Sequence, residues 1–147
     1  MKKITLMLLM LVTIGASAFA KDEETVNQQV LSSFKQEFTD AKDVSWQNSR
    51  EFAKVTFTLN DQVMFAFYSQ TGDLLAITRN ISSDKLPISL LTGVKKNYSE
   101  YWITELFEMV ADGTSTYYMT VQNANVEVVL KSTEFGGWEV YKKSRKA

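Results

Sequence analysis

The sequence predicts an α+β fold in which two helices pack on one face of a single curved antiparallel sheet. Segments 25–38 and 86–98 carry apolar residues at helical spacing, and the segments that follow each of them alternate apolar and polar residues as half-buried strands do. The order of helix, short strand, hairpin, glycine turn and strand occurs twice. This predicts two tandem helix-plus-meander repeats, residues 21–82 and 83–147, which together form one compact domain because neither half could bury its own sheet.

A cleavable secretory signal peptide over residues 1–20 precedes this domain. Lys2 and Lys3 are followed by the uncharged apolar run 4–14, and Ala18 and Ala20 are small residues at the positions that signal peptidase requires. The apolar run is shorter than the roughly 20 residues of a membrane-spanning helix. We therefore expect export, cleavage after Ala20, and a periplasmic or secreted protein without a stable membrane anchor.

The first predicted helix, 25–38, is identified by Val26, Val30, Phe34 and Phe38, which recur every four residues. Acidic residues just before it favour a helix N-terminus, where the helix dipole attracts negative charge. A short strand over 43–47 follows. Its Val44 and Trp46 are expected on one face, with Trp46 in the core.

The next two alternating segments form a predicted hairpin around a three-residue turn, 60–62. This turn pairs Phe57 with Phe65 and so places Phe65 on the face covered by the helices. On this register Met64 and Tyr68 face outward. Gly72 then marks a turn into a further strand over 74–81.

The second helix is expected to open near Pro87, the only proline, because proline is tolerated in a first helical turn. Ser83 or Asp84 could cap it. The following segment, 101–110, has Trp102, Leu106 and Val110 at helical spacing, but its aromatic and β-branched beginning favours a strand, which we predict.

The last strands are expected at 117–121, 126–130 and 138–141. A four-residue turn between the first two pairs Val121 with Val126, which places Tyr118 and Val129 on the outward face.

The composition excludes several classes of function. The chain has no Cys and no His, so it cannot form a Ser–His or Cys–His nucleophile pair or the usual zinc, copper or haem sites. Glu105 and Glu108 are too weakly supported to act as a catalytic pair, and 16 basic against 17 acidic residues is not the balance of a nucleic-acid-binding protein. We expect no enzyme activity, no metal, no cofactor and no nucleic acid.

The chain resembles the PepSY-like, or beta-lactamase-inhibitor-like, small secreted bacterial proteins. The resemblance lies in the signal peptide, Phe34, Phe38, the "DVSW" of 43–46, the "FAFYSQTGDLLA" of 65–76, the "LP" of 86–87, Tyr98 and the hairpin 117–130. It implies two tandem α+β units that share a curved antiparallel sheet. The namesake inhibitors use the concave face of such a sheet to dock on an enzyme. They carry a disulfide in each domain, whereas this chain has no cysteine.

The outward sheet face is the first candidate site. Met64, Tyr68, Tyr118 and Val129 would form a docking surface for a protein or peptide partner, since Tyr and Met are enriched at interfaces. The alternative is that these are ordinary exposed apolar side chains. The predicted function is a non-catalytic binding module, with inhibition of a hydrolase as one specific form.

Two further alternatives remain open from the sequence. One is a small-ligand or envelope-component binding protein with a pocket between helices and sheet. The other concerns Trp102 and Trp138, which could be either binding anchors or core residues.

Overall fold

The computed structural model describes residues 25–133 and 135–147. The predicted signal peptide, 1–20, and its cleavage site after Ala20 lie outside the described residues. The described residues form helices and strands with these bounds: α2 (Gln28–Glu37), β1 (Lys42–Asn48), β2 (Ala53–Leu59), β3 (Gln62–Tyr68), β4 (Leu74–Asn80), the 3-10 turn η2 (Ser83–Lys85), α3 (Ile88–Asn97), β5 (Trp102–Ala111), β6 (Thr114–Gln122), β7 (Val126–Thr133) and β8 (Glu139–Arg145).

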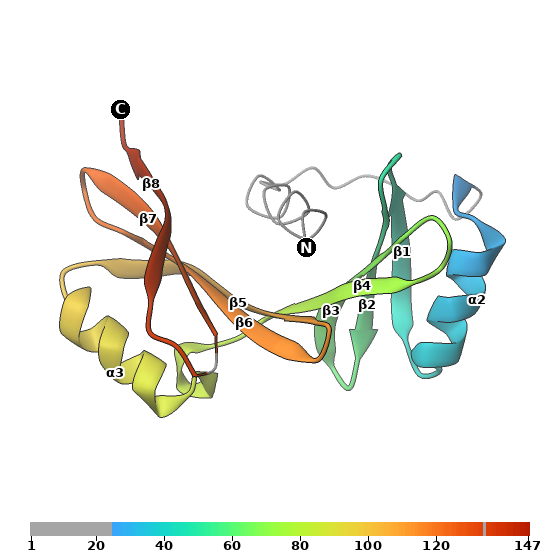
Figure 1. Cartoon of the computed structure of the whole chain (residues 1–147), viewed down its shortest axis with the longest axis horizontal. Helices are drawn as coiled ribbons and strands as arrows, with labels where there is room; N and C mark the ends of the chain where they lie inside the picture. Colours follow the sequence, from blue (N-terminus) through green and yellow to red (C-terminus); the bar gives the residue numbers. More distant parts are fainter. Residues whose placement is uncertain (1–24, 134) are drawn as a thin grey trace.

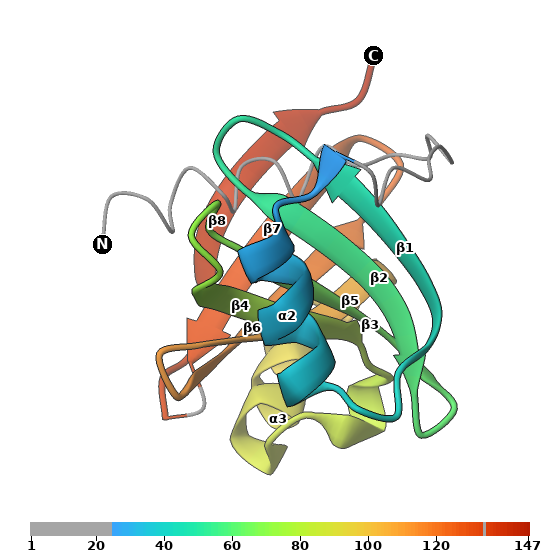
Figure 2. The same cartoon turned by 90° about the vertical axis from the view of Figure 1, so that its right-hand side faces the viewer.

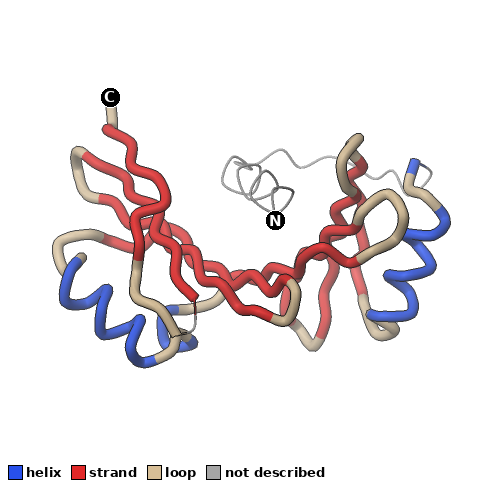
Figure 3. Tube along the Cα trace, in the orientation of Figure 1, coloured by secondary structure: helices blue, strands red, loops and turns tan. Residues whose placement is uncertain are grey.

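The strands form one open antiparallel sheet in which β1 to β8 pair strictly in chain order. The sheet is bent into an arch, with α2 and α3 at opposite ends of its convex side (Figures 1 and 3). Seen from the α2 end, the helix lies in front of the first strands (Figure 2). The predicted α+β class is therefore confirmed, with both helices on the same side of the sheet.

Helix α2 begins at an N-cap, Asn27, whose side chain accepts a hydrogen bond from the backbone N–H of Gln29 at 2.8 Å. Its apolar stripe buries Val30, Leu31 and Phe34. These side chains pack on the convex side of β1 to β3 in a first core that includes Trp46, Val55, Phe57, Ala66 and Tyr68.

Helix α3 buries Leu90 and Val94 in a second core, together with side chains of β5 to β7. Its N-cap residue is Pro87, and no side chain caps the helix. The expectation that Ser83 or Asp84 caps α3 is wrong, because both residues belong to η2, before the helix begins.

The first hairpin differs by one residue from the prediction. Asn60 and Asp61 both have positive φ, 49° and 61°, and form a two-residue turn in place of the predicted three-residue turn 60–62. Phe57 consequently pairs with Met64 rather than with Phe65. Because a shift of one residue moves every side chain to the opposite face, all of β3 faces the other way.

The hairpin between β6 and β7 differs by two residues from the prediction, since Val121 pairs with Val128 and not with Val126. A shift of two residues preserves the faces. Val121 and Val128 both lie in the α3 core, and the predicted outward orientation of Tyr118 and Val129 is correct.

The ambiguous segment 101–110 is a strand, β5, as predicted. Trp46 lies in the first core, 3% exposed, again as predicted, whereas Val44 is 42% exposed. Of the tryptophans left open, Trp102 is half exposed, and Trp138 is partly buried with its Nε1 donating to the backbone oxygen of Leu90 at 2.8 Å.

A third cluster lies on the opposite, concave side of the sheet. Its buried members are Phe67, Ala76, Phe107, Met109 and Tyr118. They come from β3 to β6, so this cluster joins strands that follow α2 to strands that follow α3.

Candidate functional site

The concave face is the candidate site because no described element packs on it, whereas α2 and α3 cover the convex face (Figure 3). Strand alternation decides which residues reach it. In the β2–β3 pair, Lys54 of β2 lies opposite Phe67 of β3, and Thr56 of β2 lies opposite Phe65 of β3. Since Val55 and Ala66 belong to the α2 core, these four residues point to the concave side.

An aromatic layer runs across the middle of this face. The rings of Phe107 and Tyr118 stack at 5.0 Å and 18°, and Tyr141 of β8 meets Tyr118 edge-on at 5.9 Å. On the other side, Phe52 meets Phe67 at 5.7 Å. Such offset and edge-to-face pairs are the favoured ring geometries, and each adds to the stability gained from burial alone.

Two lysines accompany the aromatic layer. The ammonium of Lys54 lies 4.7 Å from the ring centre of Phe65 and 5.8 Å from that of Phe67, and that of Lys131 lies 5.8 Å from Tyr118. Burial lowers the pKa of Lys54 below its ordinary value, because a low-dielectric environment disfavours the charged form. The Lys54 side chain thus lies among ring faces, whose attraction for a cation offsets part of the cost of its burial.

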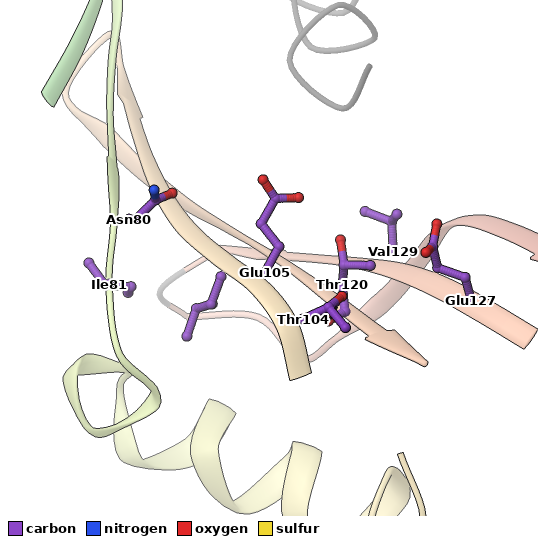
Figure 4. Close-up of a pocket in the computed structure, with 8 residues that line it drawn as sticks. Asn80, Ile81, Thr104, Glu105, Thr120, Glu127 and Val129 are labelled. Carbon is purple, nitrogen blue, oxygen red and sulfur yellow. Dashed lines mark hydrogen bonds between the residues drawn. The ribbon is translucent and has the colours of Figure 1, made fainter. Parts of the chain in front are cut away.

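A hollow of about 620 Å³ lies beside this layer, towards the α3 end (Figure 4). Glu105 of β5 and Glu127 of β7 point to the same side of the sheet, with Thr120 and Val129 between them. The hollow is open to solvent and more polar than the aromatic layer. Within residues 25–133 and 135–147, no three acidic side chains gather closely enough to hold a metal ion.

The predicted site residues fall on both sides of the sheet. Tyr118 and Val129 lie on the concave face as predicted, but they are only 1% and 4% exposed, so the expectation that they are exposed side chains is wrong for both. Met64 and Tyr68 do not lie on the concave face, because the two-residue turn shifts the register by one residue and so reverses the faces of β3. They pack into the convex core beneath α2, where Tyr68 is fully buried, so the prediction that they face outward is wrong.

Tyr68 is a core residue with a polar end. Its ring meets Phe34 edge-on at 6.5 Å, and its hydroxyl donates to Glu37 Oε2 at 2.9 Å. Burial, followed by the hydrogen bond and the negative charge of Glu37, raises the pKa of Tyr68 well above its ordinary value. This hydroxyl anchors the last turn of α2 to β3.

Sequence reasoning missed Phe65 and Phe67 as members of the candidate face, whereas it placed Lys54 correctly on the side of β2 that faces away from the helices. The signal that could have found them is the Asn60–Asp61 pair, because Asn and Asp tolerate the positive φ of a two-residue hairpin turn. It was obscured because β3 is apolar at nearly every position, so its alternation does not identify the buried face.

Glu105 and Glu108, which the sequence did not support as a catalytic pair, are separated by the fold. Glu105 points to the concave hollow, whereas Glu108 accepts a hydrogen bond from Arg79 Nε at 2.7 Å and one from the Ser115 hydroxyl at 3.0 Å. Side chains three apart on a strand point to opposite faces. Glu108 is therefore paired with Arg79 and Ser115, and it does not pair with Glu105.

In the part of the chain that the structure describes, no helix has the length and apolar character needed to cross a membrane.

Comparison with known proteins gives a fold but no sequence family. No protein-family model matches the chain, and no curated protein matches its sequence. Several solved structures do share its fold. A DUF2874 family protein from Bacteroides ovatus superposes with a TM-score of 0.72 at 17% identity, over 82% of this chain and 88% of the other. A protein from Bacteroides eggerthii described as periplasmic gives 0.72 at 11% identity, with the same coverage.

A BLIP-like protein from Bacteroides fragilis superposes with a TM-score of 0.70 at 14% identity, over 85% of this chain and 92% of the other. At these identities the likeness concerns the fold and not the activity. The resemblance to the beta-lactamase-inhibitor-like proteins is thus supported in architecture, and the PepSY-like part of it stays a prediction. This chain has the BLIP-like fold found in these Bacteroides proteins.

Proposed function

We propose that the chain is an exported, non-catalytic binding module that docks a protein or peptide partner on its concave sheet face. One observation carries the proposal: an aromatic and apolar layer, which includes Phe67, Phe107 and Tyr118, lies on the face that no described helix covers. Aromatic residues and methionine are enriched in the cores of protein interfaces, with polar residues at the rim.

The shape of the face supports a macromolecular partner. An arched sheet presents a broad concave surface, which suits a convex loop or domain better than a small molecule. The half-buried residues Phe52, Phe65, Leu75, Ala111 and Tyr141 surround the buried centre of the layer and would make the first contacts.

Inhibition of a hydrolase is the specific form of this function that the fold suggests. It rests on the BLIP-like description of one structural neighbour and on the family resemblance of the sequence. No residue of this chain can be matched to an inhibitory contact.

We also propose that the two halves, residues 21–82 and 83–147, are tandem units that together build the concave face. Each half contributes the same order of elements, one helix followed by four strands. The half-buried residues around the concave cluster include Phe52, Phe65 and Leu75 from the first half and Ala111 and Tyr141 from the second, so a partner centred there would contact both halves.

The alternative, a small-ligand carrier with a pocket between helices and sheet, gains no support from the packing beneath α2. Beneath α2 the space is filled by Phe34, Trp46 and Phe57, each at most 4% exposed. The hollow of about 340 Å³ at the edge of α2 and β1 is open to solvent. We therefore prefer the protein or peptide partner.

The test is a crosslinking pull-down with the exported chain as bait, from the exported fraction of its source cells. Thr56→Arg introduces a bulky charge on the concave face, and Thr92→Arg makes the same change on the exposed surface of α3. We expect one dominant partner that is lost with Thr56→Arg and kept with Thr92→Arg. Its crosslinks should map to Lys131 on the concave face and not to Lys95 on α3.

Partner recovery that is equal with both variants, or crosslinks that map to α3, would contradict the concave-face proposal. Circular dichroism of the two variants establishes that both are folded before the comparison is made.

A further inference from the structure

Resting on the proposed function, we propose that the partner inserts an acidic side chain into the concave aromatic layer and pairs it with the Lys54 ammonium. The partner's docking segment is thus an Asp or Glu flanked by apolar residues. Lys54 would select that segment among all apolar segments able to fit the face.

The first support is the burial of Lys54. The residue is 7% exposed and lies in β2, between Gln47 of β1 and Phe67 of β3. Lysine is almost never this buried unless it is paired, since its ammonium is strongly hydrated in water.

The second support is that Lys54 has no acidic partner within the described residues 25–133 and 135–147. The ion pairs found there are Arg79 with Glu108 and Lys85 with Asp84, and no hydrogen bond of the Lys54 ammonium occurs. The contrast with Arg79 is informative. Arg79 has a side chain that is 44% exposed and still has a carboxylate at 2.7 Å, whereas the more buried Lys54 has only the faces of Phe65 and Phe67.

The third support is energetic. Burying a cation without a counter-charge costs free energy, and cation–π contacts recover only part of it. An apolar side chain of similar length would fill the same space without that cost. A carboxylate brought in by a partner would restore an ion pair in a site shielded from water by aromatic rings, where such pairs are strongest.

The chemistry of Lys54 defines the ligand group. An ammonium has three donor hydrogens and no acceptor capacity, so it requires an acceptor, and a carboxylate gives short, charge-assisted hydrogen bonds. A basic side chain at this point would be repelled. The expected contribution is therefore mainly to specificity, as is general for charged groups within interfaces.

The test uses a phage-displayed library of random peptides, selected against the exported chain and assayed as synthetic peptides. We expect the selected sequences to share an Asp or Glu flanked by apolar residues. Changing that acid to its amide, Asp→Asn or Glu→Gln, should weaken binding to the unmodified chain about tenfold or more, because it leaves a buried charge unpaired.

Two variants of the chain make the test specific. Lys54→Met is an apolar replacement that preserves side-chain length. The dissociation constants of its complexes with the acid and amide peptides should differ by no more than about twofold, because the ammonium that pairs with the acid is absent. Lys95→Met, which removes an exposed ammonium on α3, away from the concave face, should retain the tenfold difference. Nuclear magnetic resonance of the lysine side chains should also show the pKa of Lys54 rising when an acid peptide binds.

Selected peptides without an acidic residue, or an acid-to-amide difference that is equal in the unmodified chain and in Lys54→Met, would overturn the proposal. A selection that yields no peptide would overturn it as well. Self-association of the unmodified chain that is abolished by Lys54→Met would assign the face to a second copy and would equally overturn it.

Binding of the same peptides to Thr56→Arg and Lys54→Met distinguishes failure of the Lys54 proposal from failure of the concave-face function. If Thr56→Arg abolishes peptide binding while Lys54→Met leaves the acid preference intact, the concave face binds partners and only the role of Lys54 fails. If Thr56→Arg has no effect on binding, the concave-face function fails.

Discussion

At the scale of the residue, Tyr68 shows how one buried hydroxyl ties a helix to the sheet. Its phenol is surrounded by Phe34 and Trp46 and donates to Glu37 on α2. Ionisation of this phenol would leave a buried negative charge beside a carboxylate. The folded state therefore resists deprotonation of Tyr68 more strongly than the unfolded state does.

The stability of the protein should consequently fall as the pH rises above about 10, the ordinary pKa of tyrosine. Above that pH the unfolded chain releases the Tyr68 proton while the folded chain retains it, so the free energy of unfolding decreases by about 1.4 kcal/mol per pH unit for this group. Urea unfolding between pH 8 and pH 11 would measure this. In Tyr68→Phe, the free energy of unfolding should decline less steeply with pH. At pH 7 it should be about 1 kcal/mol lower than in the unmodified chain, because the hydrogen bond to Glu37 is lost.

Glu37→Gln is the control, because it keeps the buried phenol and should keep most of the decline at high pH. Equal slopes for the unmodified chain and Tyr68→Phe would show that the raised pKa of Tyr68 does not contribute to stability.

At the scale of the element, two hairpins of the sheet use the same two-residue turn with different residues. The turn between β2 and β3 is Asn60–Asp61, and that between β5 and β6 is Asp112–Gly113, with all four residues at positive φ. Glycine adopts this conformation without steric strain, whereas other residues pay a cost. The first turn is thus the more strained of the two.

Replacing Asp61 with glycine should stabilise the protein by up to about 1 kcal/mol, because it relieves the strain at φ 61°. The reciprocal change, Gly113→Asp, should destabilise it by a similar amount, since a Cβ at that position meets nothing within 4 Å and only the backbone cost remains. Both can be measured by chemical denaturation. Effects of the same sign for the two substitutions would contradict this account of the turns.

At the scale of the whole molecule, the concave cluster joins what would otherwise be two separate cores. The cores beneath α2 and α3 share no residue, and the polar pair Arg79–Glu108 sits on β4 and β5, where the two halves of the sheet meet. Phe107 stacks on Tyr118 and packs in the same cluster as Phe67, so it links the halves from the concave side. We therefore expect the sheet to unfold as one cooperative unit.

Phe107→Ala should lower the free energy of unfolding by about 3–5 kcal/mol, as the loss of a buried phenylalanine usually does. It should also reduce the protection of backbone amides in both β2 and β6, because both halves depend on the shared cluster. Hydrogen exchange would test this, with Leu90→Ala in the α3 core as the comparison. If Phe107→Ala reduced protection in β6 alone, the halves would be independent.

The local pattern of the sequence was sufficient for the class and order of the elements. Helical spacing located α2 and α3 to within a few residues, and β-branched and aromatic content distinguished β5 from a helix, because both signals depend on neighbouring residues alone. The outward positions of Tyr118 and Val129 also followed from alternation, since the error in that hairpin was an even number of residues.

Only the tertiary structure decided which side of β3 is buried, and with it the composition of the candidate face. Val63 to Tyr68 are apolar on both sides of the strand, so either side could have met α2. The choice was made by the two-residue turn at Asn60–Asp61, which placed Tyr68 against Phe34 and Glu37 and left Phe65 and Phe67 beside Lys54. The reason is physical: strand faces alternate with every residue, so a register difference of one residue, too small to detect in the hydrophobic pattern, exchanges the core and the surface.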